Sequence, residues 1–549
     1  MRRLGLLLLF VACSSTPAVQ DGGPSAGDAA PSGSWCHPDQ HAPYAQRSTF
    51  PGLHAGGQNW NRVPCTGPSA VEASWTALQG LVVFQPATIS GDGATLFATV
   101  ARTGAADCKI YAVNTLDGSQ RCLGSSAFSA GVSGSSVELD ADGFAYVTDG
   151  YTANVEGVVV KFDPATGKEI WRAVLPNLGS SEGAPPSTYR TPAGLHFTPD
   201  GHAVTATVDG VVVLIDRSSG KITASLPLQT ATGIHPQPGA TGEVKLPPYF
   251  KRNIEAAVGT MSQEDITYMF SASLGNSGKF GDNTIGVSPR GQLFITGPGR
   301  RAGEGSLIAI DITESAQLRV RWISFFIGGS ATSPVVSSDG ARVVIGDNAS
   351  NVNYIYVDDC NNNHDADSDP NVCSPKWTFK LPGQPLLGAP AMDEDGIVYA
   401  WASNTDPSTS DLFAIGDDGG KPRVIWEKNL TPAGDTYHVW SSAATVLDNM
   451  IIGTVTNMKR TVSAGSAPIP LVLEATHEVM AIDRKTGVTL WSLPVADDSI
   501  NSLLMGPDGS IFVPELGMLD LSSPNEKQTF TGGIARIAPL AKTRKSRAR

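Results

Sequence analysis

The side chains with the clearest chemical potential alternate along one short segment, DDCNNNHDADSDPNVC. Asn361, Asn363, Asp365, Asp367 and Asp369 occupy every second position there, between two cysteines. Carboxylate and amide oxygens are the ligands that Ca²⁺ prefers, and the ion takes about six to eight of them. A turning backbone would point such alternate oxygens at one cation. The segment therefore predicts a structural calcium site, with a solvated polar loop as the alternative.

Further polar and aromatic residues lie just before apolar runs that recur along the chain. They are Asp282, Asn283, His438, Trp440, Asp498 and Asn501. Gathered at one mouth of a channel, these side chains would form a ligand site, because ligands bind at concave surfaces. Scattered over separate loops, they would not. We assign no catalytic residue, since the chain lacks the haem motif Cys-x-x-Cys-His, the Gly-x-Ser-x-Gly elbow and the HExxH motif.

The elements that would hold these residues repeat about eight times. Each copy has an apolar run, an Asp-Gly turn, a second apolar run, an Ala-Ile-Asp strand, a Thr-Gly turn and a tryptophan, as in HEVMAIDRKTGVTLW. Aspartate and glycine suit hairpin turns because both tolerate positive φ. The first turns of the copies fall at Asp92-Gly93, Asp142-Gly143, Asp200-Gly201, Arg290-Gly291, Asp339-Gly340, Asp395-Gly396, Asp448-Asn449 and Asp508-Gly509.

This repetition predicts an all-β fold, an eight-bladed β-propeller of four-stranded antiparallel blades. Successive turns lie about 50 to 60 residues apart, except between Asp200 and Arg290, where we expect a partly helical insertion at about 227–282. The propeller is expected over residues 81–540, with the chain near 80–86 closing the ring by adding a strand to the last blade. The tryptophans that end the repeat are expected to pack between blades: Trp171, Trp322, Trp377, Trp426 and Trp491.

The phrase Ala-Ile-Asp-x-x-Thr-Gly-x-x-x-Trp, seen in KFDPATGKEIW and AIDRKTGVTLW, resembles the repeat of the pyrroloquinoline-quinone-like (PQQ-like) propellers. That family includes quinoprotein alcohol dehydrogenases. It also includes the eight-bladed lipoprotein subunit of the outer-membrane β-barrel assembly machinery, which binds no quinone. The resemblance implies the fold over roughly residues 84–540 and leaves the activity open. Quinone dehydrogenases of the alcohol type commonly carry two adjacent cysteines, and this chain has none.

Residues 1–12 have the layout of a secretory signal, with Arg2 and Arg3 before a short apolar run. The run ends in Val-Ala-Cys, which resembles a bacterial lipobox, so we expect lipidation of Cys13; the alternative is an ordinary cleaved signal. Residues 13–34 are rich in Ser, Pro, Gly and Ala, as a flexible tether is. Ser14 is similar to the residue that follows the cysteine in lipoproteins moved to the outer membrane. We therefore expect an outer-membrane lipoprotein of the bacterial cell envelope, facing the periplasm or the cell surface.

Six cysteines remain when Cys13 is set aside, an even number that suggests three disulfides in an exported chain. Their neighbourhood along the chain predicts the pairs Cys36–Cys65, Cys108–Cys122 and Cys360–Cys373, of which the second would span a hairpin. The first pair would staple residues 35–80 ahead of the first blade.

The formal net charge of -13 argues against binding to nucleic acid and against broad adhesion to anionic lipid. The basic tail at 541–549 opposes this trend. It is interpreted either as a solubilising end or as an anchor on an anionic polymer.

Two classes of function stay open at this point. In the first, the propeller is a membrane-tethered, non-catalytic platform for a protein or polysaccharide partner, with no cofactor beyond a structural Ca²⁺. In the second, it is a periplasmic PQQ-dependent oxidoreductase acting on alcohols or sugars. Small residues where the repeats begin, such as Ala-Thr-Ser-Pro at 331–334, and the missing cysteine pair favour the first class.

Overall fold

The computed structural model describes most of the repeats and the segment that precedes them. The described residues are 35–37, 43–83, 85–100, 108–124, 135–149, 157–176, 192–207, 209–235, 280, 283–301, 303–330, 332–362, 371–382, 389–402, 411–430, 436–440, 442–460, 472–515 and 532–540. The expected signal and tether, Cys13, Asp282, the basic tail and most of the insertion lie outside them. The described part of the chain contains no helix with the length and apolar character needed to cross a bilayer.

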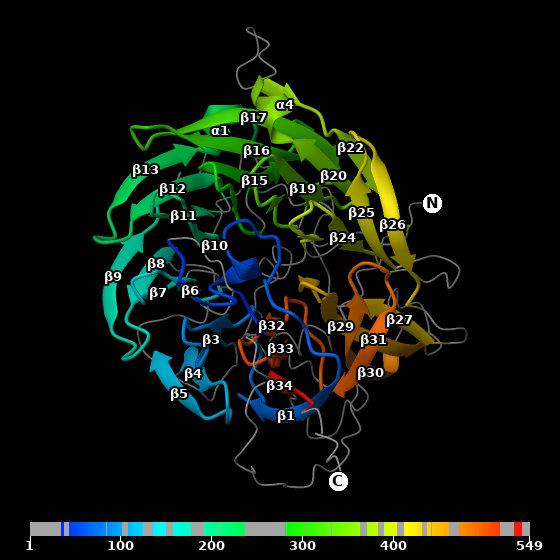
Figure 1. Cartoon of the computed structure of the whole chain (residues 1–549). Coiled ribbons are helices and arrows are strands. Elements are labelled where there is room, and N and C mark those ends of the chain that lie inside the picture. Colours follow the sequence, from blue (N-terminus) through cyan, green and yellow to red (C-terminus); the bar gives the residue numbers. More distant parts are fainter. Residues whose placement is uncertain are drawn as a thin grey trace, which may run out of the picture.

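Eight antiparallel sheets stand around a central axis, which confirms the predicted eight-bladed propeller (Figure 1). The first four blades are built in chain order, each from its innermost strand outward. Their strands are β2 (Thr88–Ile89), β3 (Thr95–Thr99), β4 (Ile110–Asn114), β5 (Gln120–Gly124); β6 (Glu138–Leu139), β7 (Ala145–Asp149), β8 (Val158–Phe162), β9 (Glu169–Val174); β10 (Pro192–Phe197), β11 (His202–Thr207), β12 (Val211–Asp216), β13 (Ile222–Pro227); and β14 (Gly286–Val287), β15 (Gln292–Pro298), β16 (Glu304–Ile312), β17 (Leu318–Ile327).

Blades 5 to 8 follow the same plan, and the last one ends in a strand from the beginning of the chain. Their strands are β18 (Val335–Val336), β19 (Arg342–Gly346), β20 (Asn351–Tyr356), β22 (Trp377–Lys380); β23 (Ala391–Met392), β24 (Val398–Trp401), β25 (Leu412–Asp417), β26 (Pro422–Lys428); β28 (Thr445–Val446), β29 (Met450–Arg460), β30 (Val472–Asp483), β31 (Thr489–Val495); and β32 (Leu504–Met505), β33 (Ile511–Glu515), β34 (Gly533–Pro539), β1 (Val71–Ala77).

Two blades carry one strand more than the sequence predicts. The short β21 (Asn371–Cys373) adds to β17 in parallel, and β27 (Thr436–Trp440) adds to the far end of β29. The described residues also form three short helices, η1 (Leu53–Ala55), α1 (Leu228–Thr232) and α4 (Val357–Asn362). Of these, α1 follows β13 at the start of the expected insertion.

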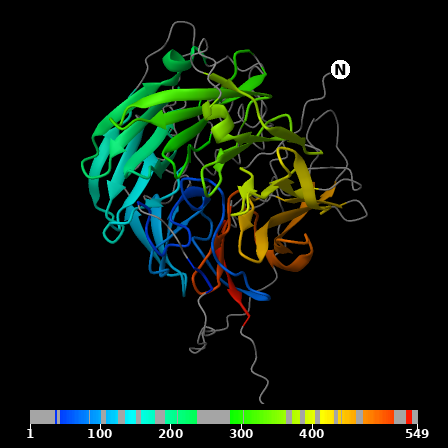
Figure 2. The ribbon, with the colours of Figure 1, turned by 45° about the horizontal axis from the view of Figure 1, so that its top comes forward.

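The predicted turns join the first and second strands of each blade, and we call them the inner turns. Gly93 and Gly143 have φ of 72° and 84°, the backbone region in which glycine is least restricted. In an antiparallel blade the turn between the third and fourth strands, which we call the outer turn, lies on the same side of the disc as the inner turn. We call this side the turn face, and the opposite side, which carries all other links, the connection face; Figure 2 gives an oblique view of the disc.

The strand that closes the ring differs from the expected one. It is β1, which pairs with β34 from Val71–Pro539 to Ala77–Ile534, and residues 80–86 form no strand of that sheet. The apolar run at 81–83 is buried instead, and Val83 N–H donates a hydrogen bond to Glu515 O. A buried link and a buried strand have similar apolar compositions. The prediction therefore took the apolar run at 81–83 for the closing strand, about one strand length too late in the chain.

The repeat tryptophans hold neighbouring blades together, as predicted, and the structure adds a sixth. Trp171 Nε1 donates to Arg217 O of the next blade at 3.0 Å, and Trp426 Nε1 donates to Arg484 O at 2.9 Å. Trp75 on β1 does the same across the closure, donating to Leu116 O at 3.0 Å and lying against Gly118. Trp75 therefore fastens the last blade to the first.

We predict that Trp75→Ala lowers the free energy of unfolding by about 2 kcal/mol, because a half-buried indole and its hydrogen bond are lost at the closure. The matched control is Thr76→Ala, an exposed neighbour on the same strand. Urea denaturation followed by tryptophan fluorescence compares the two variants. Equal midpoints would show that Trp75 contributes nothing to closure.

Candidate functional site

The centre of the propeller is occupied by the chain itself. We call residues 43–67, which precede the first strand, the channel segment; Figure 1 shows this blue trace inside the ring. Ile89 N–H on β2 donates to Phe50 O, and Leu139 N–H on β6 donates to Pro51 O, both at 2.9 Å. The same position on four further innermost strands donates in the same way. These bonds are Val287 to Gly57, Val336 to Gln58, Met392 to Trp60 and Val446 to Asn61.

The two remaining blades are reached through side chains of the channel segment. Phe197 N–H on β10 donates to Tyr44 Oη at 3.1 Å, and Thr49 Oγ1 donates to Met505 O on β32 at 2.6 Å. The channel segment therefore contacts the innermost strand of every blade. Sequence reasoning placed this segment ahead of the first blade and missed its position, because it carries no repeat and no periodic pattern.

Polar side chains of the channel segment bond to blades 3, 4 and 5 and to one another. Asn59 Nδ2 donates to Ile285 O and to Pro334 O, each at 3.0 Å, and Asn59 Oδ1 accepts from His196 Nε2 at 2.9 Å. His54 Nδ1 donates to Asn61 Oδ1 at 2.9 Å. The ring nitrogens of His196 and His54 are assigned as donors in these bonds, because the amide oxygens of Asn59 and Asn61 can only accept.

Burial shifts the pKa of three titratable groups inside the channel toward their neutral forms. Burial lowers the pKa of His54 to about 4, and burial together with nearby His54 lowers the pKa of His196 to about 3. Burial raises the pKa of Glu138 well above its ordinary value, although Leu53 N–H donates to its Oε1 at 2.7 Å. Both histidines are therefore neutral at pH 7, and burial shifts Glu138 in the direction of its neutral form as well.

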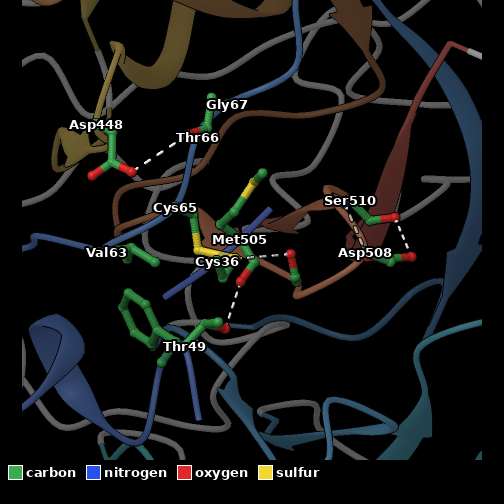
Figure 3. The surroundings of a disulfide bond; sticks show 12 residues. Cys36, Thr49, Val63, Cys65, Thr66, Gly67, Asp448, Met505, Asp508 and Ser510 are labelled. Carbon is green, nitrogen blue, oxygen red and sulfur yellow. Dashed lines mark hydrogen bonds between the residues drawn. A yellow bond between two sulfur atoms is a disulfide. The ribbon is translucent and has the colours of Figure 1, made fainter. Parts of the chain in front are cut away.

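A disulfide closes the channel segment into a loop. Cys36 and Cys65 are joined across a sequence separation of 29 residues, and both are buried at the turn face (Figure 3). The structure also joins Cys108 to Cys122 and Cys360 to Cys373, so all three pairs agree with those expected from the sequence. The segment between Cys36 and Cys65 cannot leave the ring as a free end.

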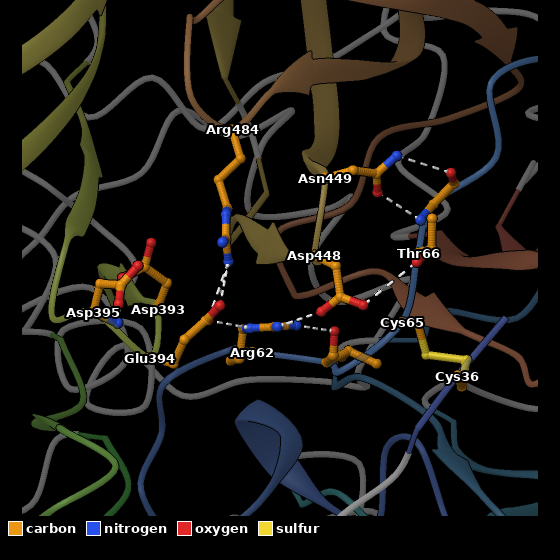
Figure 4. A network of polar contacts seen from close by, with 12 residues as sticks. Cys36, Arg62, Cys65, Thr66, Asp393, Glu394, Asp395, Asp448, Asn449 and Arg484 are labelled. Carbon is orange, nitrogen blue, oxygen red and sulfur yellow. Dashed lines mark hydrogen bonds and ion pairs between the residues drawn. A yellow bond between two sulfur atoms is a disulfide. The ribbon is translucent and has the colours of Figure 1, made fainter.

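An ion-pair network fixes the same segment to blades 6 and 7 at the turn face (Figure 4). Arg62 Nε donates to Glu394 Oε2 at 2.8 Å, and Arg62 also pairs with Asp448. Arg484 Nη1 lies 3.0 Å from Glu394 Oε1. Burial alone would raise the pKa of Glu394, but the bonds and charge of Arg62, followed by those of Arg484, lower it to about 2. Glu394 is therefore ionised at neutral pH.

The described members of the expected mouth residues come from blades 4, 7 and 8, and a ligand site formed by them stays a prediction. Asn283 leads into blade 4, where its Oδ1 accepts from Thr284 N–H at 2.9 Å, whereas Asp498 and Asn501 lead into blade 8. His438 lies on β27 opposite Asn457, and Asp282 is outside the described residues. Trp440 is 3% exposed and lies against Gly453, so it is a core residue and presents no ring surface to a ligand.

A group of buried carboxyls between blades 7 and 8 escaped sequence reasoning, apart from Asp498. Asp497, Asp498 and Glu515 are each exposed by 2% or less. Thr456 Oγ1 lies 3.4 Å from Asp498 Oδ2 and 3.1 Å from His477 Nδ1. Burial first, and then the charge of Asp497, raise the pKa of both Asp498 and Glu515 well above the ordinary values. No sequence motif indicates that Glu515 belongs to this group.

The expected calcium residues fall mostly outside the described part of the chain. Asn361 lies on α4, where its Oδ1 accepts from Trp322 Nε1 at 3.0 Å and from Gln292 Nε2 at 3.2 Å. That oxygen serves the contact between blades 4 and 5. Asn363, Asp365, Asp367 and Asp369 are not described, so a calcium ion there stays a prediction. Among the described residues, no group of three or more His, Cys, Asp or Glu side chains is arranged to hold a metal ion.

We predict that replacing both Cys36 and Cys65 by serine lowers the free energy of unfolding by about 3.5 kcal/mol in the chain-entropy account. The channel segment should also become a substrate for limited proteolysis, because its bonds to the blades can then open one by one. The control pair, Cys108→Ser with Cys122→Ser, removes a crosslink of similar entropy within one blade. Cleavage between residues 43 and 67 in both variants, or in neither, would contradict this role of the first disulfide.

We predict that Glu515→Gln stabilises the protein at alkaline pH and changes little near pH 4. A carboxyl whose folded pKa is raised contributes stability below its unfolded pKa and loses it as pH rises toward the folded value, by about 1.4 kcal/mol per pH unit. A neutral amide removes this loss. Melting temperatures from about pH 4 to pH 9 test the prediction, with exposed Glu427→Gln as the control. A parallel pH profile for wild type and Glu515→Gln would refute it.

Comparison with known proteins finds the same repeat. The family model described as outer membrane protein assembly factor BamB matches residues 155–245, which include the phrase ending at Trp171. No curated protein matches the chain.

Solved structures share the propeller at low sequence identity. The quinohemoprotein alcohol dehydrogenase from Comamonas testosteroni is 12% identical, over 91% of this chain and 81% of its own, with a TM-score of 0.50. BamB from Moraxella catarrhalis is 12% identical, over 74% of this chain and 96% of its own, with a TM-score of 0.35. Identities this low carry no activity from one protein to another. The matched repeat and the eight blades are consistent with a propeller of the PQQ-like repeat type.

Proposed function

We propose that this chain is an exported, membrane-tethered propeller that acts as a non-catalytic platform for a protein or polysaccharide partner. The filled channel carries the proposal. A ligand bound on the axis of a propeller needs an open mouth and polar groups that converge on it. Here the axis holds residues 43–67, which are bonded to the innermost strands of all eight blades.

The residues of the channel do not fit a quinone and its metal ion. Such a site needs oxygen ligands for a cation and a flat surface against which the ring stacks. The carboxyl of Glu138 is instead enclosed by the channel segment, since a Cβ on Gly52 would lie 1.6 Å from Glu138 Oε2. Trp440, the aromatic residue expected at the mouth, is buried in the core. No step of quinone chemistry is therefore assigned to this chain.

Export and tethering are supported by the cysteines. Three disulfides fit an oxidising compartment such as the periplasm. With these six cysteines paired, Cys13 is the one cysteine left for a lipid. The match to the family described as an outer-membrane assembly factor supports a protein as the partner.

The connection face is the surface we assign to the partner. It carries the long links between strands, including the one that follows α1, and long loops on a rigid scaffold are where binding residues concentrate. The hairpin of β29 and β30 also reaches beyond the shorter β31, which pairs only from His477 onward. The turn face, by contrast, consists mainly of short turns, apart from the longer link between β20 and β22 that carries α4.

We predict that a photo-crosslinking residue at Ile327, which is 72% exposed at the connection end of β17, forms a defined adduct in the native envelope. The same probe at Ala165, on the outer turn of blade 2, should form none. Equal adducts at both positions, or none at either, would count against the platform.

Purified protein supplied with pyrroloquinoline quinone, Ca²⁺, alcohols and aldose sugars should leave a redox dye unreduced. Substrate-dependent reduction that disappears in Asp498→Asn would favour the oxidoreductase instead. A quinone absorbance in protein purified from its native host would point the same way.

A further inference from the structure

The two ends of the described chain leave the propeller at one place. Thr66 N–H donates to Trp35 O at 2.7 Å, and Leu540 N–H donates to Ala70 O at 3.0 Å. Residues 66 and 70 are four positions apart, which spans at most about 14 Å of extended chain. The tether that precedes Trp35 and the tail that follows Leu540 therefore start side by side.

That place lies on the turn face, next to blade 8. Gly67 N–H donates to Asn449 Oδ1 in the inner turn of blade 7 at 2.7 Å. The ring of Trp35 lies against Gly509 in the inner turn of blade 8, where an added Cβ would meet it at 2.8 Å. β34 runs from the connection face to the turn face and delivers Leu540 to the same side.

The tail carries a charge opposite to that of the chain as a whole. Residues 541–549 read AKTRKSRAR, with five basic residues and no acidic one, while the formal net charge of the chain is -13. Aspartates stand in most inner turns of the turn face, so the disc itself is a poor surface for anionic lipid. Nine residues extend to about 30 Å and can reach past this acidic surface.

We propose that the turn face beside blade 8 faces an anionic lipid bilayer, held there by the basic tail together with the lipid on Cys13. The lipid is taken from the proposed function, whereas the tail is an independent contact. A single acyl chain holds a protein to a bilayer only marginally, and a polybasic segment supplies the second attachment. This arrangement turns the connection face toward the partner.

The first test uses the full chain with Cys13→Ser, which carries no acyl chain, and sedimentation with lipid vesicles. The chain should bind vesicles that contain phosphatidylglycerol and ignore vesicles of phosphatidylcholine alone, and salt should abolish the binding. Neutralising the tail with K542Q, R544Q, K545Q, R547Q and R549Q should weaken binding at least about tenfold. The control replaces four exposed basic residues away from the turn face by glutamine, namely Arg172, Arg300, Arg301 and Lys380, and should retain binding.

Several outcomes would overturn the proposal. They are equal binding to both kinds of vesicle, equal loss in the tail variant and its control, and binding to soluble heparin without binding to vesicles. No binding at all would mean that the tail folds back on the acidic disc, which also rejects it.

The second test uses acylated protein on vesicles that contain a spin-labelled lipid. A fluorophore at Ala165→Cys on the turn face should be quenched more than one at Ile327→Cys on the connection face. The reverse order, or equal quenching, would reject the orientation. Protein that takes up no acyl label and stays off the native membrane would instead refute the tether of the proposed function, and vesicle binding through the tail would be unaffected.

Discussion

The structure depends on one constraint, which is that the backbone N–H groups facing a propeller's axis need acceptors. A buried N–H without a partner costs a free energy comparable to a lost hydrogen bond, so such groups are nearly always paired. In seven of the eight blades the last residue of the innermost strand donates its N–H to the channel segment. The channel segment supplies Phe50, Pro51, Gly57, Gln58, Trp60 and Asn61 carbonyls, and Tyr44 Oη, to seven of the eight blades.

The conformation of the channel segment shows how closely it follows these donors. His54, Ala55, Asn59 and Asn61 have φ between 53° and 65°, a region that costs a non-glycine residue about 1 to 2 kcal/mol. A free segment would relax, so its contacts with the blades hold these angles. The same fit buries His54, His196 and Glu138, and burial shifts the pKa of each toward the neutral form. The ion pairs of Arg62 lie instead at the turn face.

Local physics explains which parts of this structure could be predicted from the sequence. The inner turns, the blades and the repeat tryptophans follow from short-range patterns in the sequence. The cysteine pairs were predictable because each joins two cysteines that are neighbours along the chain. The channel segment, PYAQRSTFPGLHAGGQNWNRVPCTG, has no period because its partners are backbone groups of eight separate blades. Trp75 was missed because its strand precedes the first repeat, and Glu515 because only the fold brings it to Asp497 and Asp498. Of the expected mouth residues, Asn283 leads into blade 4, Asp498 and Asn501 lead into blade 8, and Trp440 lies in the core.

The same filling separates this propeller from one that binds a ligand on its axis. A ligand there would have to replace seven backbone hydrogen bonds, and at about 1 kcal/mol for each the displacement alone would weaken its binding by about five orders of magnitude. The Cys36–Cys65 disulfide adds a geometric obstacle, since the segment can leave only as a closed loop. The surfaces left for recognition are the two faces of the disc. One is built mainly of short turns and the longer β20–β22 link, and the other of long connections.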